Sequence, residues 1–148
     1  MNYTIRRFEE KDEQKVAEMM VESFRSEPWR ETWTREQCQE RIHILTQALS
    51  SVSYVLMDEK GDICGAALGY TLPYMDKKEY ELQEFFISSR LQHLHIGSFF
   101  MKEFLNEIKK EGIDQIRFYT SGNLCNFYSK FGFRKSETDY MMEGEISD

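Results

Sequence analysis

One stretch in the second half of the sequence has the residue types of an anion-binding loop. Residues 90–104, RLQHLHIGSFFMKEF, place polar side chains and Gly97 ahead of an apolar stripe at helical spacing. The first N–H groups of a helix have no intrahelical partner and carry a partial positive charge, which suits a phosphate or pyrophosphate. An ordinary amphipathic helix start has the same pattern, so this stretch alone leaves both interpretations open.

Two carboxylates just before this stretch could act as acids or bases. Glu81 and Glu84 lie in YELQEFFIS, residues 80–88, whose apolar and aromatic residues predict a strand. Side chains alternate between the faces of a regular strand, so residues three apart point to opposite faces unless a bulge intervenes. Either acid is equally explained as a solvated side chain on a half-exposed strand.

Cysteine and histidine spacing predicts no metal site. The cysteines, at positions 38, 64 and 125, form no C-x-x-C pair, and we expect reduced thiols packed in the core. The histidines, at positions 43, 93 and 95, lack a third ligand at metal-like spacing. We therefore expect no metal cofactor.

The composition is that of a folded, acidic protein. The 148 residues can bury a core without disulfides, and we expect a single domain over residues 1–148. The net charge of −7 disfavours nucleic acid as a partner and favours a cationic small molecule or peptide. No apolar run approaches a membrane span, and the N-terminus has no apolar leader core, so we expect a cytoplasmic protein without a membrane partner.

Hydrophobic periodicity predicts the element order β-α-α-β-β-β-α-β-α-β. Apolar residues from Val16 to Phe24 indicate a helix ending near Pro28, and Thr34 and Gln37 have the spacing of a capping box at the next helix. Residues 53–72 predict a hairpin, with a turn at residues 59–62. The other predicted elements are strands at 3–8, 80–88, 113–120 and 133–144, a helix from about residue 96 to Gly112, and a short helix at 122–131. Helices between strands predict an α/β (α+β) fold, a mixed sheet with helices on both faces.

The segment ELQEFFISSRLQHLHIGSFFMKEFL (81–105), the motif FYSKFGF (127–133) and this element order resemble the GNAT superfamily of N-acetyltransferases, which use acetyl-coenzyme A. The resemblance covers nearly the whole chain by element order and about a third by motif. It implies a mostly antiparallel sheet of about six to seven strands. It also implies a loop of pattern Q/R-x-x-G-x-G/A whose amides bind the coenzyme pyrophosphate.

Two of the three motif positions in this loop match. Gln92 stands at the first and Gly97 at the last, whereas His95 replaces the middle glycine. His keeps the backbone N–H but raises the cost of a left-handed angle. A left-handed His95 would favour a non-catalytic module. Residues implied to bind the coenzyme are Phe86, Ile87, Gln92, His93, Leu94, His95, Ile96, Gly97, Ser98, Asn123 and Lys130.

The resemblance assigns the proton donor to a tyrosine. Tyr128 precedes Gly132 by the interval at which many GNAT enzymes place the tyrosine that protonates the departing thiolate. Its alternative is a half-buried aromatic with a solvated hydroxyl. Asn123 is the nearest match to an asparagine that touches the coenzyme arm, but it lies two residues closer to the tyrosine than in the commoner pattern.

Acetyl transfer to an amine also needs a base, because a primary ammonium with a pKa of about 10.4 is only ~0.1% deprotonated at neutral pH. Glu81 lies where some members carry a catalytic glutamate, so it is the first candidate and Glu84 the second. The family carries a β-bulge in this strand that splays it from the next strand. Amides near Phe86 and Ile87 would then stabilise the developing oxyanion.

The acceptor region is the least determined. FRSEPWRETWTREQ, residues 24–37, would form one wall of the site, and Glu27, Trp29, Glu31 and Trp33 could hold a cationic amine or simply pack a helix corner. SFRSEPW resembles the same region of bacterial proteins near the aminoglycoside acetyltransferases.

We therefore expect direct acetyl transfer from acetyl-CoA to a small cationic amine. A peptide or protein amine is the second choice of acceptor. The alternative function is a non-catalytic acyl-CoA-binding regulatory module on the same fold. A homodimer is the general expectation for a soluble oligomer.

Overall fold

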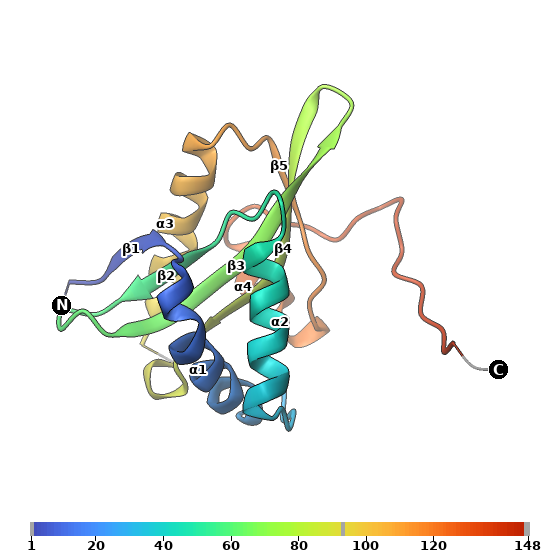
Figure 1. Ribbon diagram of the computed structural model, residues 1–148. Helices are drawn as coiled ribbons and strands as arrows, with labels where there is room; N and C mark the ends of the chain where they lie inside the picture. The colour runs from blue at the N-terminus through green and yellow to red at the C-terminus, as the bar shows by residue number, and fades with distance from the viewer. Residues whose placement is uncertain (1, 93, 147–148) are drawn as a thin grey trace.

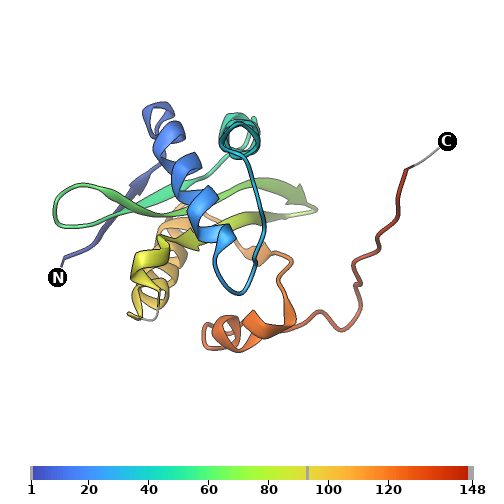
Figure 2. The same ribbon diagram turned by 90° about the horizontal axis from the view of Figure 1, so that it is seen from below.

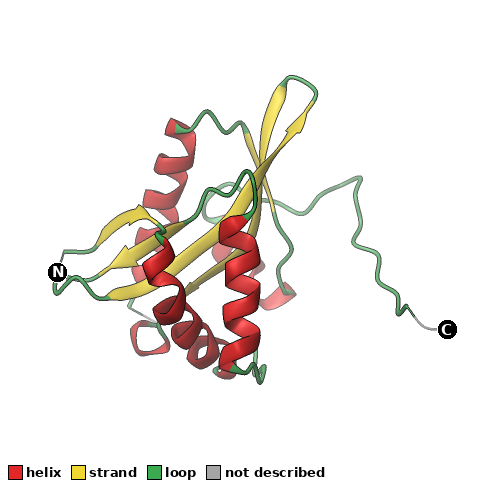
Figure 3. Cartoon of the chain, in the orientation of Figure 1, coloured by secondary structure: helices red, strands yellow, loops and turns green. Residues whose placement is uncertain are grey.

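The chain forms a five-stranded sheet with helices on both faces (Figures 1, 2 and 3). This computed structural model describes residues 2–92 and 94–146. The strands follow chain order across the sheet: β1 (Thr4–Arg7), β2 (Tyr54–Met57), β3 (Ile63–Tyr74), β4 (Lys77–Ile87) and β5 (Gln115–Arg117). Neighbours pair antiparallel except β4 and β5, which are parallel. The predicted mixed sheet is confirmed.

Helices α1 (Glu13–Arg25) and α2 (Arg35–Gln47) cover one face of the sheet. Their apolar stripes are buried against sheet residues such as Leu68 and Phe86. The predicted capping box begins α2: the Gln37 N–H donates to Thr34 Oγ1 at 3.1 Å, and the Thr34 N–H donates to Gln37 Oε1 at 2.9 Å. The capping box satisfies two N–H groups that the first turn would leave unpaired.

Helix α3 (Ile96–Lys110) covers the other face of the sheet (Figure 2). Phe100 and Phe104 are fully buried, and the Phe104 ring packs edge-on against Tyr80 at 5.5 Å. Gly112, at φ 78°, ends the helix as predicted, with its N–H donating to the Lys109 carbonyl and that of Ile113 to the Ile108 carbonyl. This Schellman arrangement needs a left-handed residue, which glycine adopts at least cost.

Strands β3 and β4 form one long hairpin that is longer than the sequence predicted. Residues 73–74 and 77–79, which lie between the two predicted strands, pair as strand instead, down to Tyr74 opposite Lys77. The turn therefore contains only two residues, Met75 and Asp76. The predicted turn between β2 and β3 is confirmed, with the Asp58 N–H donating to the Asp62 carbonyl at 2.9 Å.

A β-bulge interrupts this hairpin at Gln83. Leu68 pairs with Glu84 and Gly69 with Leu82, so Gln83 is the extra residue in β4. A Cβ atom on Gly69 would collide with the Glu81 carbonyl oxygen and lie 2.7 Å from the Tyr80 ring. The bulge therefore depends on a close backbone approach that only glycine allows.

The last predicted strand is wrong. After β5 the chain forms the short helix α4 (Cys125–Ser129), and residues 133–146 lie in no strand and extend away from the sheet (Figures 1 and 2). The sheet consequently has five strands and not six or seven. The segment 133–144 has strand-like residues, but it pairs with none of the five strands.

No helix within residues 2–92 and 94–146 is both long and apolar enough to cross a membrane. Cys38 and Cys64 are buried thiols, as predicted, and Cys125 is half-buried. Across the same described ranges, no three His, Cys, Asp or Glu side chains lie together as metal ligands would.

We predict that Gly69→Ala destabilises the protein by about 2–3 kcal/mol, because the added methyl group must push β4 out of its bulge. Thermal unfolding should show a fall in Tm of roughly 5–10 °C. Gly122→Ala is the matched control, since a Cβ atom there meets nothing within 4 Å. Equal melting temperatures for the two variants would contradict this role of Gly69.

Candidate active site

The bulge brings the two candidate carboxylates onto one face of the sheet. Glu81 pairs with Tyr70 and Glu84 with Leu68, and both partners pack on the side of α1 and α2. Directly opposite residues of an antiparallel pair share a face, so Glu81 and Glu84 share it too. Without the extra residue they would point to opposite faces of the strand. The bulge is therefore the irregularity that the sequence analysis required for the two acids to share a face.

Glu84 is buried and paired with a residue that the sequence did not single out. Its side chain is 9% exposed, and Arg41 Nε of α2 donates to Glu84 Oε1 at 2.6 Å. Burial raises the pKa of Glu84 above its ordinary value, although Arg41 opposes this. Spacing along the sequence carried no signal for this pair, because its members lie 43 residues apart on different elements.

The thiol of Cys38 lies in the electrostatic field of this ion pair. Burial, and then the charge of Glu84, raise the pKa of Cys38 to about 11, while Arg41 lowers it. Cys38 is fully buried and stays protonated at neutral pH. It therefore packs the core beneath the carboxylate and is no nucleophile.

Strands β4 and β5 separate just beyond Glu81. Their pairing extends only from Glu79 opposite Gln115 to Glu81 opposite Arg117. An antiparallel ladder with β3 uses the N–H of every second residue, so the other N–H groups of residues 82–87 face the side that β5 has left. Phe86 and Ile87, expected to lie beside a thioester, belong to the part of β4 that pairs with β3 but no longer with β5. Ser23 Oγ of α1 donates to the Ile87 carbonyl at 2.9 Å.

Helix α3 starts close to the end of β4. The first intrahelical bond runs from the Phe99 N–H to the His95 carbonyl at 3.3 Å. The N–H groups of Ile96, Gly97 and Ser98 therefore have no intrahelical partner. A Cβ atom on Gly97 would lie 3.6 Å from Phe127 and 3.9 Å from Ile87, so β4, α3 and α4 meet at this residue.

His95 has a left-handed backbone, with φ 62° and ψ 13°. Of the residues before it, Gln92 is half-buried and Leu94 is exposed, and His93 lies outside the described residues. The left-handed angle is the one that glycine adopts freely and histidine at a cost of ~1–2 kcal/mol. We expected from the sequence that a left-handed His95 would favour a non-catalytic module that binds acyl-CoA, and this angle therefore favours that alternative.

Tyr128 lies in an aromatic cluster at the separation of β4 and β5. Its ring is 4.6 Å from that of Phe118, which follows β5, and 5.1 Å from Phe127. Burial, and then the charge of Glu84, raise the pKa of Tyr128 to about 12. The phenol therefore keeps its proton at neutral pH and can serve as a hydrogen-bond donor near Glu84.

Two residues expected at the coenzyme lie on the exposed surface around α4. The Asn123 Oδ1 atom accepts a bond from Ser121 Oγ at 2.5 Å, and Lys130 follows the end of α4. Both side chains are exposed. Neither has a contact within the described residues that brings it to the start of α3.

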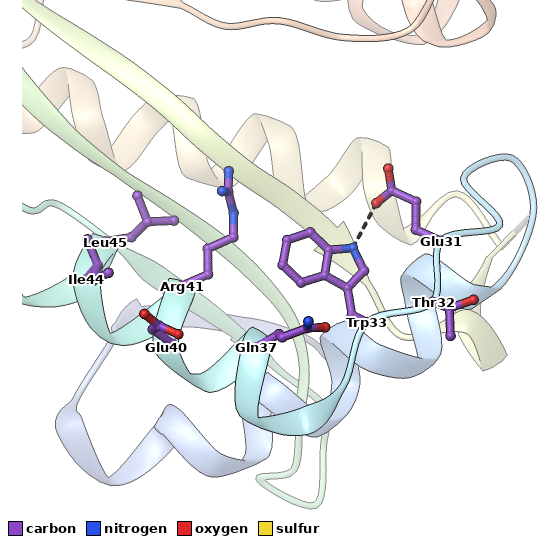
Figure 4. A pocket seen from close by; sticks show the side chains of 8 residues that line it. All are labelled: Glu31, Thr32, Trp33, Gln37, Glu40, Arg41, Ile44 and Leu45. Atoms are coloured by element: carbon purple, nitrogen blue, oxygen red, sulfur yellow. Dashed lines mark hydrogen bonds between the residues drawn. The ribbon is translucent and has the colours of Figure 1, made fainter. Parts of the chain in front are cut away.

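A hollow of about 620 Å³ lies beside α2, and two of the four predicted acceptor residues line it (Figure 4). Trp33 Nε1 donates to Glu31 Oε1 at 2.9 Å, and the Arg41 guanidinium lies 5.9 Å from the Trp33 ring centre. Five further lining residues lie on α2, and nothing in the sequence indicated that they belong to a site, because an ordinary amphipathic helix has the same residue types: Gln37, Glu40, Arg41, Ile44 and Leu45. Arg41 connects this hollow to Glu84.

The other two predicted acceptor residues lie outside the hollow. Glu27 forms an exposed ion pair with Arg30, and Trp29 packs on Phe24 at 5.1 Å. Phe24 in turn packs on Phe86 at 5.4 Å. Trp29 therefore fills the helix corner, which is the simpler of its two sequence interpretations.

We predict that Arg41→Met destabilises the protein by about 1–3 kcal/mol above neutral pH, because Glu84 is left buried without its cation. The pKa of Glu84 is raised in the fold, so its protonation favours the folded state as the pH falls. Thermal melting should thus show the deficit shrinking as the pH falls through that raised pKa toward the ordinary 4.5. Adding Glu84→Gln should remove the pH dependence, and a constant deficit from pH 8 to 4 would contradict the assignment.

Comparisons with known proteins agree with the fold and identify the family. The chain matches the sequence model of the acetyltransferase (GNAT) domain over residues 8–146. A possible acetyltransferase from Clostridium difficile 630 has a similar structure, with a TM-score of 0.81, 13% identity and coverage of 100% of both chains. A search of curated proteins finds no significant match.

Two further solved structures have the same fold. Glucosamine-6-phosphate N-acetyltransferase from Arabidopsis thaliana has a TM-score of 0.69 at 17% identity, over 99% of this chain and 100% of that one. A transcriptional regulator from Bacillus halodurans C-125 has a TM-score of 0.74 at 18% identity, over 97% and 100%. At these identities the neighbours show the fold, whereas the domain match spans nearly the whole sequence. The chain therefore belongs to the GNAT acetyltransferase family.

Proposed function

We propose that this protein is an acetyl-CoA-dependent N-acetyltransferase that transfers acetyl directly to a small amine. The observation that carries the proposal is the junction of three features at the end of β4. They are the N–H groups at the start of α3 that have no partner within the helix, the opening between β4 and β5, and the bulge that turns Glu81 and Glu84 to one face. Family membership supports acyl transfer as the general chemistry.

The residues present fit a coenzyme with a pyrophosphate. Three successive N–H groups at a helix start, Ile96 to Ser98, suit two linked phosphates, and their donors do not depend on side chains. The free edge of β4 offers further N–H groups to an extended pantetheine arm and to the thioester carbonyl. Bound at this position, the thioester would lie beside the carboxylate face of the sheet.

The proposed chemistry assigns one proton to each of two side chains. Glu81 takes a proton from the acceptor ammonium, directly or through water, and the free amine attacks the thioester carbonyl. The new C–N bond forms as the C–S bond breaks, and Tyr128 donates its proton to the departing thiolate. The second proton, which the nitrogen loses on becoming an amide, passes through water to the Tyr128 phenolate and restores the phenol. Within residues 2–92 and 94–146, no ion pair engages Glu81, whereas Arg41 holds Glu84. This contrast supports Glu81 as the base and Glu84 as an anchor for Arg41.

The hollow beside α2 supports a cationic acceptor. Glu31 and Glu40 supply negative charge and Trp33 supplies an aromatic face, a combination that attracts an ammonium group. A small amine is the first choice, because a 620 Å³ hollow has the size of a small-molecule site. A peptide or protein amine remains the second choice.

The left-handed His95 favours a second candidate, a regulatory module that binds acyl-CoA without catalysis. A strained residue next to the three N–H donors is compatible with a site that has lost the glycine of its family pattern. Both candidates need the coenzyme. They differ in whether Glu81 and Tyr128 do chemistry.

We predict that saturating acetyl-CoA raises the Tm by roughly 5–10 °C, since a ligand at 100 times its Kd adds ~2.7 kcal/mol. His95→Gly should keep this shift and raise the stability of the free protein by up to ~1 kcal/mol, because it relieves the left-handed angle and retains the N–H. His95→Val should lower stability by ~1–2 kcal/mol. No shift at millimolar acetyl-CoA would refute both candidates.

We predict that Tyr128→Phe lowers kcat about 100-fold or more while the Kd for acetyl-CoA changes little, as measured by thiol release with a panel of amines. Tyr119→Phe is the matched control, because Tyr119 is 72% exposed.

Glu81→Gln should abolish the acid limb of the pH–rate profile, and Glu84→Gln should keep it. Coenzyme binding without thiol release from any amine would favour the regulatory module.

A further inference from the structure

Ser23 of α1 carries a buried hydroxyl whose partner lies outside its own helix. The side chain is fully buried, and its Oγ donates to the Ile87 carbonyl at 2.9 Å, 64 residues away in the sequence. The Thr46 hydroxyl of α2, by contrast, donates to the Ile42 carbonyl of its own helix at 2.8 Å, which is the common local pattern for Ser and Thr. The Ser23 hydrogen bond instead joins α1 to the end of β4.

The Ile87 carbonyl belongs to the edge of β4 that β5 has left. The Ser88 N–H donates to the Cys64 carbonyl, on the β3 side, at 2.8 Å. Neighbouring residues of an antiparallel ladder turn their backbone groups to opposite sides, so both groups of Ile87 point away from β3. On that side the pairing with β5 ends at Glu81. Ser23 therefore supplies the donor that a neighbouring strand would otherwise give this carbonyl.

The next two carbonyl groups along the chain are also engaged. The Ser88 carbonyl accepts from the Leu91 N–H at 2.9 Å, and the Ser89 carbonyl accepts from the Gln92 N–H at 3.3 Å. The N–H of Ile87 faces the opening, and the first three N–H groups of α3 have no partner within the helix. The backbone between β4 and α3 thus engages its acceptors from Ile87 to Ser89 and leaves donors free, which suits an anion.

Ile87 is a close neighbour of the helix start that would receive the pyrophosphate. A Cβ atom on Gly97 would lie 3.9 Å from the Ile87 Cδ1 atom. A carbonyl oxygen carries partial negative charge, and an unpaired one at the end of β4 would repel phosphate oxygens bound beside it. The hydrogen bond from Ser23 withdraws this oxygen from the anion.

We propose that Ser23 is a positioning residue for the pyrophosphate end of the coenzyme. By holding the Ile87 carbonyl it removes an acceptor from the anion site and fixes the adjoining Ile87 N–H toward the opening. Ser23 acts through the β4 backbone and does not touch the coenzyme, because it is fully buried. This inference rests on the proposed function, since it assumes that the coenzyme binds at the start of α3.

Two substitutions of equal size isolate the hydroxyl. Ser23→Thr and Ser23→Val add similar volume to the core, but only Thr keeps the donor. Calorimetric titration with coenzyme A should give a Kd about 10-fold higher for the Val variant than for the Thr variant, the worth of one hydrogen bond at a buried site. Ser23→Ala, which cannot overpack the core, should lose a similar factor relative to the unaltered protein. Thr46→Val is the matched control and should keep the unaltered Kd, because its hydroxyl serves only α2.

A second ligand separates an effect on the anion from general damage. S-acetylpantetheine carries the thioester and the pantetheine arm but no phosphate, so the Thr and Val variants should bind it with equal Kd values in an NMR titration. Equal Kd values of the two variants for coenzyme A would overturn the role of Ser23 and leave the proposed function standing. So would an equal loss of affinity for both ligands. If the unaltered protein binds no coenzyme A, the proposed function and this inference are both refuted.

Discussion

The bulge at Gln83 is the constraint on which the candidate site depends. One extra residue in β4 reverses the alternation of side chains, so that Glu81 and Glu84 share a face that a regular strand would divide between them. Gly69 makes room for it, because any side chain there would meet the Glu81 carbonyl. Beyond the bulge, β4 has lost β5 as a neighbour. A single irregularity thus accompanies the pair of acids, the free amides and the opening that would admit a coenzyme.

Glu84 is buried and forms an ion pair with Arg41, which also reaches the hollow beside α2. The carboxylate loses water, which raises its pKa, and Arg41 from α2 compensates part of that loss. Burial, and then the same charge, raise the pKa of Tyr128 to about 12. Arg41 also lies 5.9 Å from the Trp33 ring centre in the hollow beside α2, so the proposed acceptor hollow and the buried Glu84 share one cation.

Local rules predicted much of the fold, and non-local contacts account for the remainder. The capping box at Thr34, the glycine end of α3 and the turn before Asp62 were readable because each depends on neighbours in sequence. The last strand was wrong, because strand-like residues form a strand only where they pair, and residues 133–144 do not pair with the open side of β5. Arg41 was missed since a helix surface does not show which cation faces a buried acid. The angle at His95 was undetermined, because a histidine is compatible with either backbone hand.

We propose above all that the start of α3 receives the pyrophosphate of acetyl-CoA. The most direct measurement is an NMR titration of the ¹⁵N-labelled protein with coenzyme A, following the backbone amides one by one. We expect saturable shifts at Ile96, Gly97 and Ser98, accompanied by shifts in residues 82–87 of β4, because these N–H groups gain phosphate, pantetheine or thioester partners. Binding that leaves the three α3 amides unchanged and shifts signals elsewhere would contradict the claim.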